Sequence, residues 1–132
     1  MHIESKKLIV NKSAKEIYNF LTEVKNFKKL MPNGINKFEL LNNNEFIFGL
    51  NGMPEITLIK RLEIPIEKIV FESSAEKLDF SLEASVKSLD TNKSEIQLKF
   101  NGKFNPMMVM MIKGPISKFI ENLVINIPKA VQ

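Results

Sequence analysis

Apolar and polar residues alternate along the middle of the chain. The alternation is clearest where polar residues separate five apolar ones: Leu78, Phe80, Leu82, Ala84 and Val86. A period of two residues predicts a β-strand with one covered face and one wet face. The same period predicts strands over residues 35–41, 45–50, 55–63, 68–74 and 95–101. Antiparallel sheets show this pattern, whereas parallel sheets have nearly continuous apolar strands separated by helices.

The chain before this sheet predicts one strand and two short helices. Residues 2–10 read as a first strand. Ser13 and Glu16 form a capping box, in which each side chain can satisfy a free backbone N–H at a helix start. Apolar residues then recur at helical spacing from Ile17 to Val24. A second helical piece carries three apolar residues and stops at a turn: Phe27, Leu30 and Met31, then Pro32, Asn33 and Gly34.

Glycine, asparagine and proline mark the connections between strands. The Asn-Gly pair at 51–52, with Pro54 after it, predicts a turn, and Pro65 ends the strand before it. Asn101 and Gly102 could form a hairpin turn, but too little strand follows them. We therefore expect a bulge or a bend of the strand at this pair.

The last segment predicts a long helix. Asn105 is a suitable N-cap, and Pro106 fits the first helical position. Gly114 and Pro115 are expected to kink the helix or to split it. Beyond them an apolar stripe, wide enough to pack across the sheet, is formed by Ile116, Phe119, Ile120, Leu123, Val124 and Ile127.

Together these elements predict an α+β helix-grip fold over a single domain, residues 1–132. A curved antiparallel sheet of about seven strands follows two short helices, and the long C-terminal helix crosses the sheet. The local sequences that accompany this order are residues 13–21 (SAKEIYNFL), Asn26-Phe27, Leu30-Met31-Pro32 and Gly114-Pro115-Ile116. With them the chain resembles the START-like superfamily, also called SRPBCC, over nearly its whole length.

The resemblance implies a hydrophobic cavity between the sheet and the long helix. It does not imply one activity, because this fold hosts carriers, enzymes and regulators. The leading hypothesis is therefore binding or transport of a small hydrophobic ligand, such as a lipid, a quinone or a polyketide-like molecule. The alternatives are an enzyme of the polyketide cyclase or hydratase kind, and an interaction module that uses the methionine-rich start of the helix.

The composition limits the classes of partner and the compartment that we expect for the protein. The chain has no cysteine, which favours a reducing compartment such as the cytoplasm. Its net charge is +4, but Arg61 is the sole arginine among 19 basic residues, and lysine lacks the bidentate fork that suits nucleic acids. We expect no nucleic-acid partner. No apolar run is long enough to span a bilayer, and the N-terminus does not read as a signal peptide. Peripheral membrane contact and the oligomeric state stay open.

Candidate catalytic residues are few. His2 is the only histidine, which excludes a multi-histidine metal site and disfavours a catalytic triad, so we predict no metal, no cofactor and no catalytic constellation. Tyr18, Lys60 and Arg61 are the polar residues that an enzyme could turn inward. The period of two places Ile56, Leu58 and Leu62 on the face opposite Arg61, but Ile59 shares the face of Arg61. The direction of Arg61 is therefore open between an anion-binding role in the cavity and a surface ion pair.

The candidate ligand-binding residues are apolar, with one exception. Parity turns most of the phenylalanines inward, and the methionines of the helix could form a wall or a lid, because methionine is flexible and polarizable. Core filling and a partner surface are the alternatives for the same methionines. The predicted set is Phe27, Met31, Phe48, Phe71, Phe80, Leu82, Phe100, Phe104, Met108, Met111, Ile112, Phe119 and Arg61.

Overall fold

A computed structural model of the chain describes residues 1–32, 35–50, 55–74 and 79–131. The predictions for Asn33 and Gly34, for the turn at 51–54 and for Leu78 lie outside the described residues. Within the described ranges, the predicted order of strand, short helices, sheet and long helix is present.

The N-terminal elements are β1 (His2–Glu4), β2 (Leu8–Val10), α1 (Ala14–Thr22) and the 3-10 helix η1 (Val24–Leu30). The sheet continues with β3 (Ile35–Asn42), β4 (Glu45–Leu50), β5 (Ile56–Ile64), β6 (Lys68–Ser73), β7 (Asp79–Asp90) and β8 (Lys93–Lys103). The chain then forms one long helix, α2 (Pro106–Ala130).

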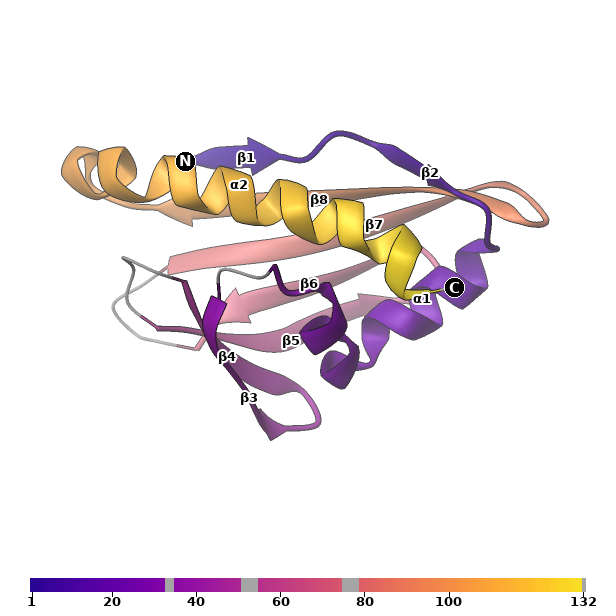
Figure 1. Cartoon of the computed structure of the whole chain (residues 1–132), viewed down its shortest axis with the longest axis horizontal. Helices are drawn as coiled ribbons and strands as arrows, with labels where there is room; N and C mark the ends of the chain where they lie inside the picture. Colours follow the sequence, from indigo (N-terminus) through magenta and orange to yellow (C-terminus); the bar gives the residue numbers. More distant parts are fainter. Residues whose placement is uncertain (33–34, 51–54, 75–78, 132) are drawn as a thin grey trace.

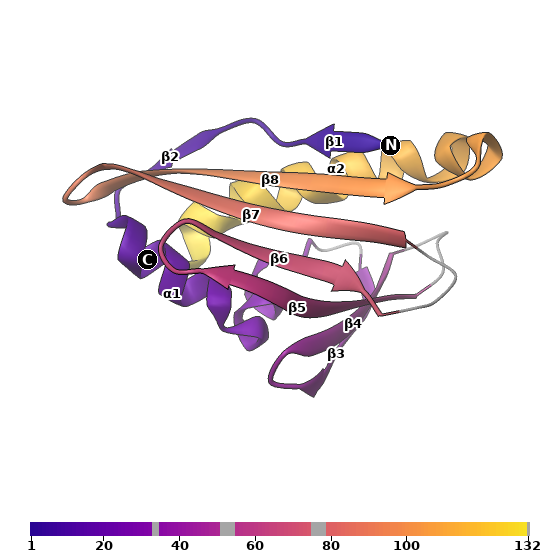
Figure 2. The same ribbon diagram turned by 180° about the vertical axis from the view of Figure 1, so that it is seen from behind.

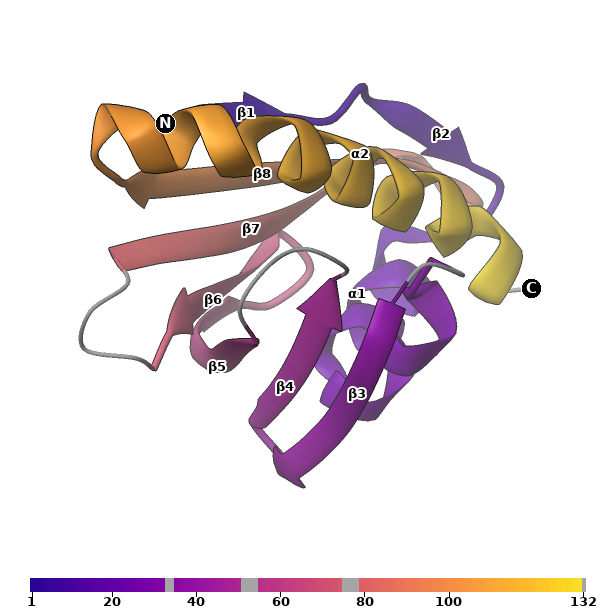
Figure 3. The ribbon, with the colours of Figure 1, turned by 60° about the vertical axis from the view of Figure 1, so that its left-hand side comes forward.

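The strands form one antiparallel sheet in the order β1-β8-β7-β6-β5-β4-β3, and β2 also pairs with β8. The helices lie on one face of this sheet, and the view from behind shows the strands in front of them (Figures 1 and 2). Helix α2 runs along the β8 side, and the sheet curves away from it towards β3 (Figure 3). This is the predicted α+β helix-grip architecture, with eight strands in the described part of the chain rather than about seven.

The extra strand arises because the predicted first strand is divided at Ser5. The backbone N–H of Ser5 donates to the carbonyl of Leu98 at 2.8 Å, and the N–H of Leu98 donates to the Ser5 hydroxyl oxygen at 3.0 Å. A buried side chain thus replaces a backbone acceptor, which interrupts the ladder between β1 and β2. Pairing resumes where Leu8 lies opposite Ile96. The prediction of a continuous strand was wrong at this point.

Strand β5 contains an irregularity that the period of two did not predict. Lys60 lies opposite Phe71, and Leu62 lies opposite Val70, so Arg61 is an extra residue in the ladder. A bulge of this kind shifts the facing of every residue after it by one position. Leu62 is therefore exposed, although its parity predicted an inward side chain, whereas Glu63 lies opposite the buried Ile69.

The expected bulge at Asn101 and Gly102 is absent from the described ladder. Strand β8 continues in register to Lys103, with Gly102 opposite Phe80. The glycine has a steric reason. A Cβ atom at this position would lie 2.2 Å from the ring of Phe104, so only glycine lets that ring lie against the strand.

The helix starts follow the predicted caps. The Ser13 hydroxyl accepts a hydrogen bond from the N–H of Glu16 at 3.2 Å, and the Asn105 side chain accepts one from the N–H of Met108 at 2.8 Å. Of the kink or split expected at Gly114 and Pro115, the split does not occur, because α2 continues through both residues. Its first turns reach beyond the end of β8 (Figures 1 and 2).

Candidate functional site

The core is packed to different degrees along α2. Near α1, η1 and the last turns of α2, many core side chains are at most 1% exposed, among them Phe27, Phe46, Phe71 and Leu123, while Tyr18 on α1 is 5% exposed. We call this region the closed half. It is filled by aromatic rings: Phe27 and Phe46 are stacked with centroids 5.4 Å apart, and Phe27 meets Phe71 edge-on at 5.0 Å.

The packing changes beside the first turns of α2. Phe80 is 6% exposed, and Leu50 and Ile112 are each 8% exposed. Phe104 and Met108 are only partly buried against the same core. We call this region the open end and define it by Leu50, Ile56, Phe80, Phe100, Phe104, Met108 and Ile112.

Three rings form a stack across the open end. The centroids of Phe80 and Phe100 are 5.5 Å apart, and those of Phe80 and Phe104 are 6.3 Å apart. Phe104 is nearly parallel to Phe100, with an interplanar angle of 3°. Phe104 connects β8 to α2, so the ring next to solvent is carried by a connection rather than by a strand.

The structure divides the predicted ligand-binding residues between these regions. The open end contains Phe80, Phe100, Phe104, Met108 and Ile112. Phe48 and Phe119 stack at 4.9 Å between β4 and the middle of α2 and mark the border of the closed half. The remaining apolar members of the set are core residues there or pack against the core: Phe27, Met31, Phe71 and Leu82.

Two predicted residues lie away from both regions. Arg61 is exposed, and its Nε atom lies 3.8 Å from the Glu72 carboxylate, which is the surface ion pair that the sequence left open. Met111 is exposed on the outer side of α2. Conversely, Leu50 and Ile56 line the open end but were not among the predicted site residues. Their signal was available, because they continue the inward parity of Phe48 and Leu58.

A separate hollow of about 520 Å³ lies on the other face of the sheet. Four of its lining residues come from neighbouring positions of β1, β8, β7 and β6 and alternate away from the core: His2, Asn101, Ser81 and Glu72. The hollow is thus lined mainly by polar strand residues. It is not the apolar cavity expected between the sheet and α2.

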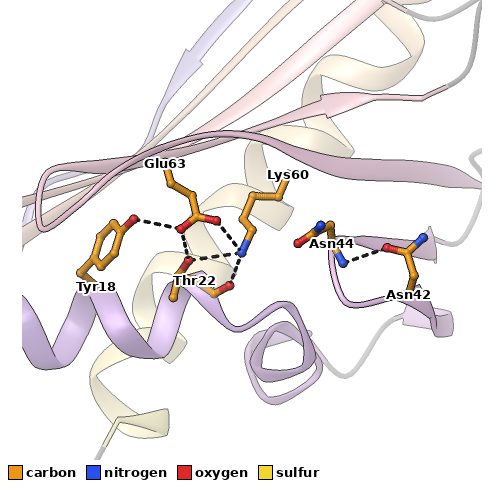
Figure 4. A network of polar contacts seen from close by, with 6 residues as sticks. All are labelled: Tyr18, Thr22, Asn42, Asn44, Lys60 and Glu63. Carbon is orange, nitrogen blue, oxygen red and sulfur yellow. Dashed lines mark hydrogen bonds and ion pairs between the residues drawn. The ribbon is translucent and has the colours of Figure 1, made fainter.

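A polar network joins α1 to β5 in the closed half (Figure 4). The Lys60 ammonium lies 2.9 Å from the Glu63 carboxylate and donates to the Thr22 carbonyl at 2.8 Å. Thr22 and Tyr18 each donate a hydroxyl to Glu63, at 3.0 and 3.3 Å. Lys60 therefore places a positive charge on the carbonyl end of α1, where the helix dipole is negative.

The network perturbs two of its own groups. The hydrogen bond from Lys60 lowers the pKa of the Glu63 carboxyl, against the partial desolvation of that carboxyl. Burial raises the pKa of the Tyr18 hydroxyl, and the nearby Glu63 carboxylate raises it further. Each of these groups is engaged by another member of the network. We interpret the network as a connection between α1 and the sheet.

This arrangement removes the support for the enzyme alternative. That hypothesis required polar side chains directed into the ligand site. Arg61 lies on the outer face, and the Tyr18 hydroxyl and the Lys60 ammonium are bound within the network at the end of α1. None of the three belongs to the open end.

The described residues offer few other groups that could catalyse a reaction or bind a metal ion. His2 is exposed on β1, where a hydrogen bond with Asn101 raises the pKa of its imidazole, and Glu4 adds to this effect. Within the described ranges no group of three acidic or histidine side chains could hold a metal ion. None of the helices in those ranges has the length and apolar character needed to span a bilayer.

The fold of the chain is similar to that of several solved structures. A START superfamily protein from Mycobacterium smegmatis superimposes with a TM-score of 0.70 at 13% identity, covering 98% of this chain and 96% of that chain. Norcoclaurine synthase from Thalictrum flavum, in complex with a transition-state analogue, gives a TM-score of 0.76 at 14% identity, with 99% and 93% covered. Another structure of that synthase, with dopamine and hydroxybenzaldehyde bound, gives 0.75 at 15% identity, with 99% and 86% covered.

No protein-family model matches the sequence, and no curated protein matches it. At these low identities the likeness is one of architecture. The order of elements, the curved antiparallel sheet and the long helix across it establish that the chain has the START-like, or SRPBCC, helix-grip fold.

Proposed function

We propose that the protein binds a small hydrophobic ligand at the open end, between the sheet and the first turns of α2. The observation that carries this proposal is the difference in packing along α2. The three phenylalanines of the open end all keep some exposure, whereas Phe27, Phe46 and Phe71 in the closed half are at most 1% exposed. Ligand-binding sites are typically concave and lined by apolar and aromatic side chains.

Phe104 and Met108 are the side chains that a ligand would displace. Both are partly buried, and Phe104 lies on the connection between β8 and α2. The hydrogen bonds that tie α2 to other elements lie further along the helix, from Lys6 to Glu121 at 3.1 Å and from Asn126 to Leu30 at 2.8 Å. The start of α2 can therefore move outward while its second half stays attached to the closed half.

The lining favours selection by shape rather than by polar recognition. All the residues that define the open end are apolar. No buried side-chain nitrogen or oxygen within the described ranges lacks a hydrogen-bond partner, so none is held in reserve for a ligand. We infer an aliphatic or aromatic ligand such as a lipid, a quinone or a polyketide-like molecule.

A fluorescent fatty acid tests the proposal directly. Dansyl-undecanoic acid is titrated into the purified protein, and native mass spectrometry records whether a copurified molecule is displaced. We expect the emission of the dansyl group to rise and shift to the blue on binding. Absence of both signals, with the protein folded by circular dichroism, would contradict the proposal.

A pair of variants locates the site. Met108→Trp fills the open end, and we expect it to weaken dansyl-undecanoate binding at least about tenfold. The reason is that the probe loses contact with about one apolar side chain, and such a contact is worth more than about 1.4 kcal/mol. Phe20→Trp introduces the same residue at a partly buried position on α1. This control should bind the probe as the wild type does. Equal affinities for both variants would place the ligand elsewhere.

A further inference from the structure

The first turns of α2 are apolar on both their inner and their outer sides. Met108 and Ile112 pack inward, while Met107, Met110 and Met111 are 74%, 86% and 68% exposed. A helix that is apolar all round is normally buried on all sides. Here only one side is covered by the chain itself. We call Met107, Met110 and Met111 the methionine tip.

The first turns of α2 belong to a stretch of the chain that contains lysines but no acidic residue. Residues 96–120 contain four lysines and no acidic residue, and the other 15 basic residues are balanced by the 15 acidic ones. The stretch that carries the methionine tip is therefore positively charged. Within it, Lys113 and Lys118 are exposed on α2.

The spacing along α2 places these lysines beside the methionines. Lys118 follows Met111 by seven residues, which is two helical turns on the same face. Lys113 follows Met110 by three residues and lies next to it on the helix surface. The first turns of α2 protrude at one end of the molecule (Figures 1 and 3). The exposed methionines lie on these turns, and the two exposed lysines follow them along the helix.

We propose that the methionine tip docks on the surface of an anionic lipid bilayer. Apolar side chains enter the boundary between headgroups and acyl chains, and adjacent lysines bind the anionic headgroups, as on interfacial helices. The helix lies on the membrane and does not cross it, since no helix in the described ranges can span a bilayer.

The charge argues against a second copy of this chain as the occupant. Two such surfaces would bring lysines of equal sign together, which costs free energy. An anionic bilayer offers the complementary charge and a large apolar layer at once.

A tryptophan probe tests the docking site. The chain has no tryptophan, so Met110→Trp provides a single reporter on the tip. The vesicles contain phosphatidylcholine with about 30% phosphatidylserine. On binding to them, we expect the tryptophan emission to shift to the blue and brominated acyl chains to quench it. Ile9→Trp, at an exposed position on β2, is the matched control and should show neither change. An unchanged Met110→Trp spectrum would overturn the proposal.

Sedimentation with the same vesicles separates the apolar and electrostatic contributions. Lys113→Gln/Lys118→Gln should weaken binding roughly 25-fold, at about fivefold per lysine near an anionic surface. The exposed pair Lys87→Gln/Lys93→Gln on the β7–β8 hairpin should bind like the wild type. Equal binding of both double variants, or equal binding to vesicles of phosphatidylcholine alone, would contradict the proposal.

The triple variant Met107→Ser/Met110→Ser/Met111→Ser should lose binding to vesicles while keeping the wild-type melting temperature, because its three sites are exposed. Analytical ultracentrifugation in the absence of lipid tests the competing occupant: wild-type dimers that the triple variant abolishes would identify a second copy and overturn the membrane assignment. Docking is independent of the proposed ligand site. Loss of dansyl-undecanoate binding in Met108→Trp with vesicle binding intact would separate the two.

Discussion

Aromatic rings pack beneath both ends of α2, but they are buried to different degrees. In the closed half, rings from β3, β4, β6 and η1 surround Phe46, which is in contact with four other phenylalanines. At the open end, a stack of three rings meets solvent through Phe104. The packing beneath one helix therefore changes along its length, and the proposed ligand site lies at the end where it is less complete.

Polar contacts follow the same division. The network of Tyr18, Thr22, Lys60 and Glu63 lies in the closed half, as does the hydrogen bond from Asn126 to Leu30. At the start of α2 the Asn105 cap satisfies the helix itself rather than another element. The comparison predicts that substitutions cost much stability in the closed half and little at the open end.

The largest expected difference is between two phenylalanines. Phe46→Ala should lower the free energy of unfolding by about 3–5 kcal/mol, because it leaves a cavity among buried rings. Phe104→Ala should cost only about 1 kcal/mol, since the ring is already partly exposed. Urea unfolding followed by circular dichroism measures both. Similar losses would break the distinction between the two halves.

The polar network should give the next largest effect. The Lys60 side chain is 11% exposed, and Lys60→Met removes the donor to Thr22 and Glu63. We expect a loss of about 1–3 kcal/mol, as for a buried group deprived of its partner. Lys68→Met removes a more exposed ion pair with Glu83 and should cost less than about 1 kcal/mol. The same urea curves compare the two variants, and equal losses would show that the network contributes no more than a surface pair.

Acidification should weaken the closed half through Glu63. Its folded-state pKa lies below the ordinary value of 4.5, so the ionised carboxylate stabilises the fold above that pH. This contribution is lost as the pH falls through the folded-state pKa. We expect Glu63→Gln to be less stable than the wild type at pH 7 and the difference to shrink below pH 4.5. The midpoints of urea unfolding, measured for both proteins across this pH range, give the difference in stability. A difference that stays constant with pH would contradict the role of the ionised Glu63 carboxylate.

The smallest expected effect is a gain in stability at the β5–β6 turn. Ile66 has φ 67°, which is unfavourable for a β-branched residue, and the N–H of Glu67 donates to the carbonyl of Ile64 at 2.9 Å. Ile66→Gly should raise the free energy of unfolding by about 0.5–1 kcal/mol, the relieved strain less the entropy cost of glycine. Ile66→Val keeps the strain and should not gain. A loss in Ile66→Gly would show that the exposed isoleucine contributes to packing.

Much of the fold could be predicted because its signals are local. The alternation of apolar and polar residues predicted the strands. The capping side chains of Ser13 and Asn105 predicted where the two helices begin. The division at Ser5 could not be predicted, since it depends on a hydrogen bond with Leu98, 93 residues away. The bulge at Arg61 leaves no local signal either, because every residue after it simply changes face.

The candidate site was predicted less completely for a related reason. Parity identifies which side chains face inward but not how tightly they pack there. Phe71 and Phe80 have the same pattern in the sequence, yet Phe71 is fully buried in the closed half and Phe80 lines the open end. The exposure of the methionine tip depends on where α2 extends beyond β8, which is a property of the assembled sheet (Figure 2).

The extra residue in β5 makes one strand position dispensable. Lys60 and Glu63 both face α1 because Arg61 takes no place in the ladder. Deleting Arg61 would restore uninterrupted pairing and leave both side chains on the inner face, whereas deleting Leu58 would turn the preceding half of the strand over. The sheet can thus lose a residue from the middle of a strand without a change in the facing of the residues on either side.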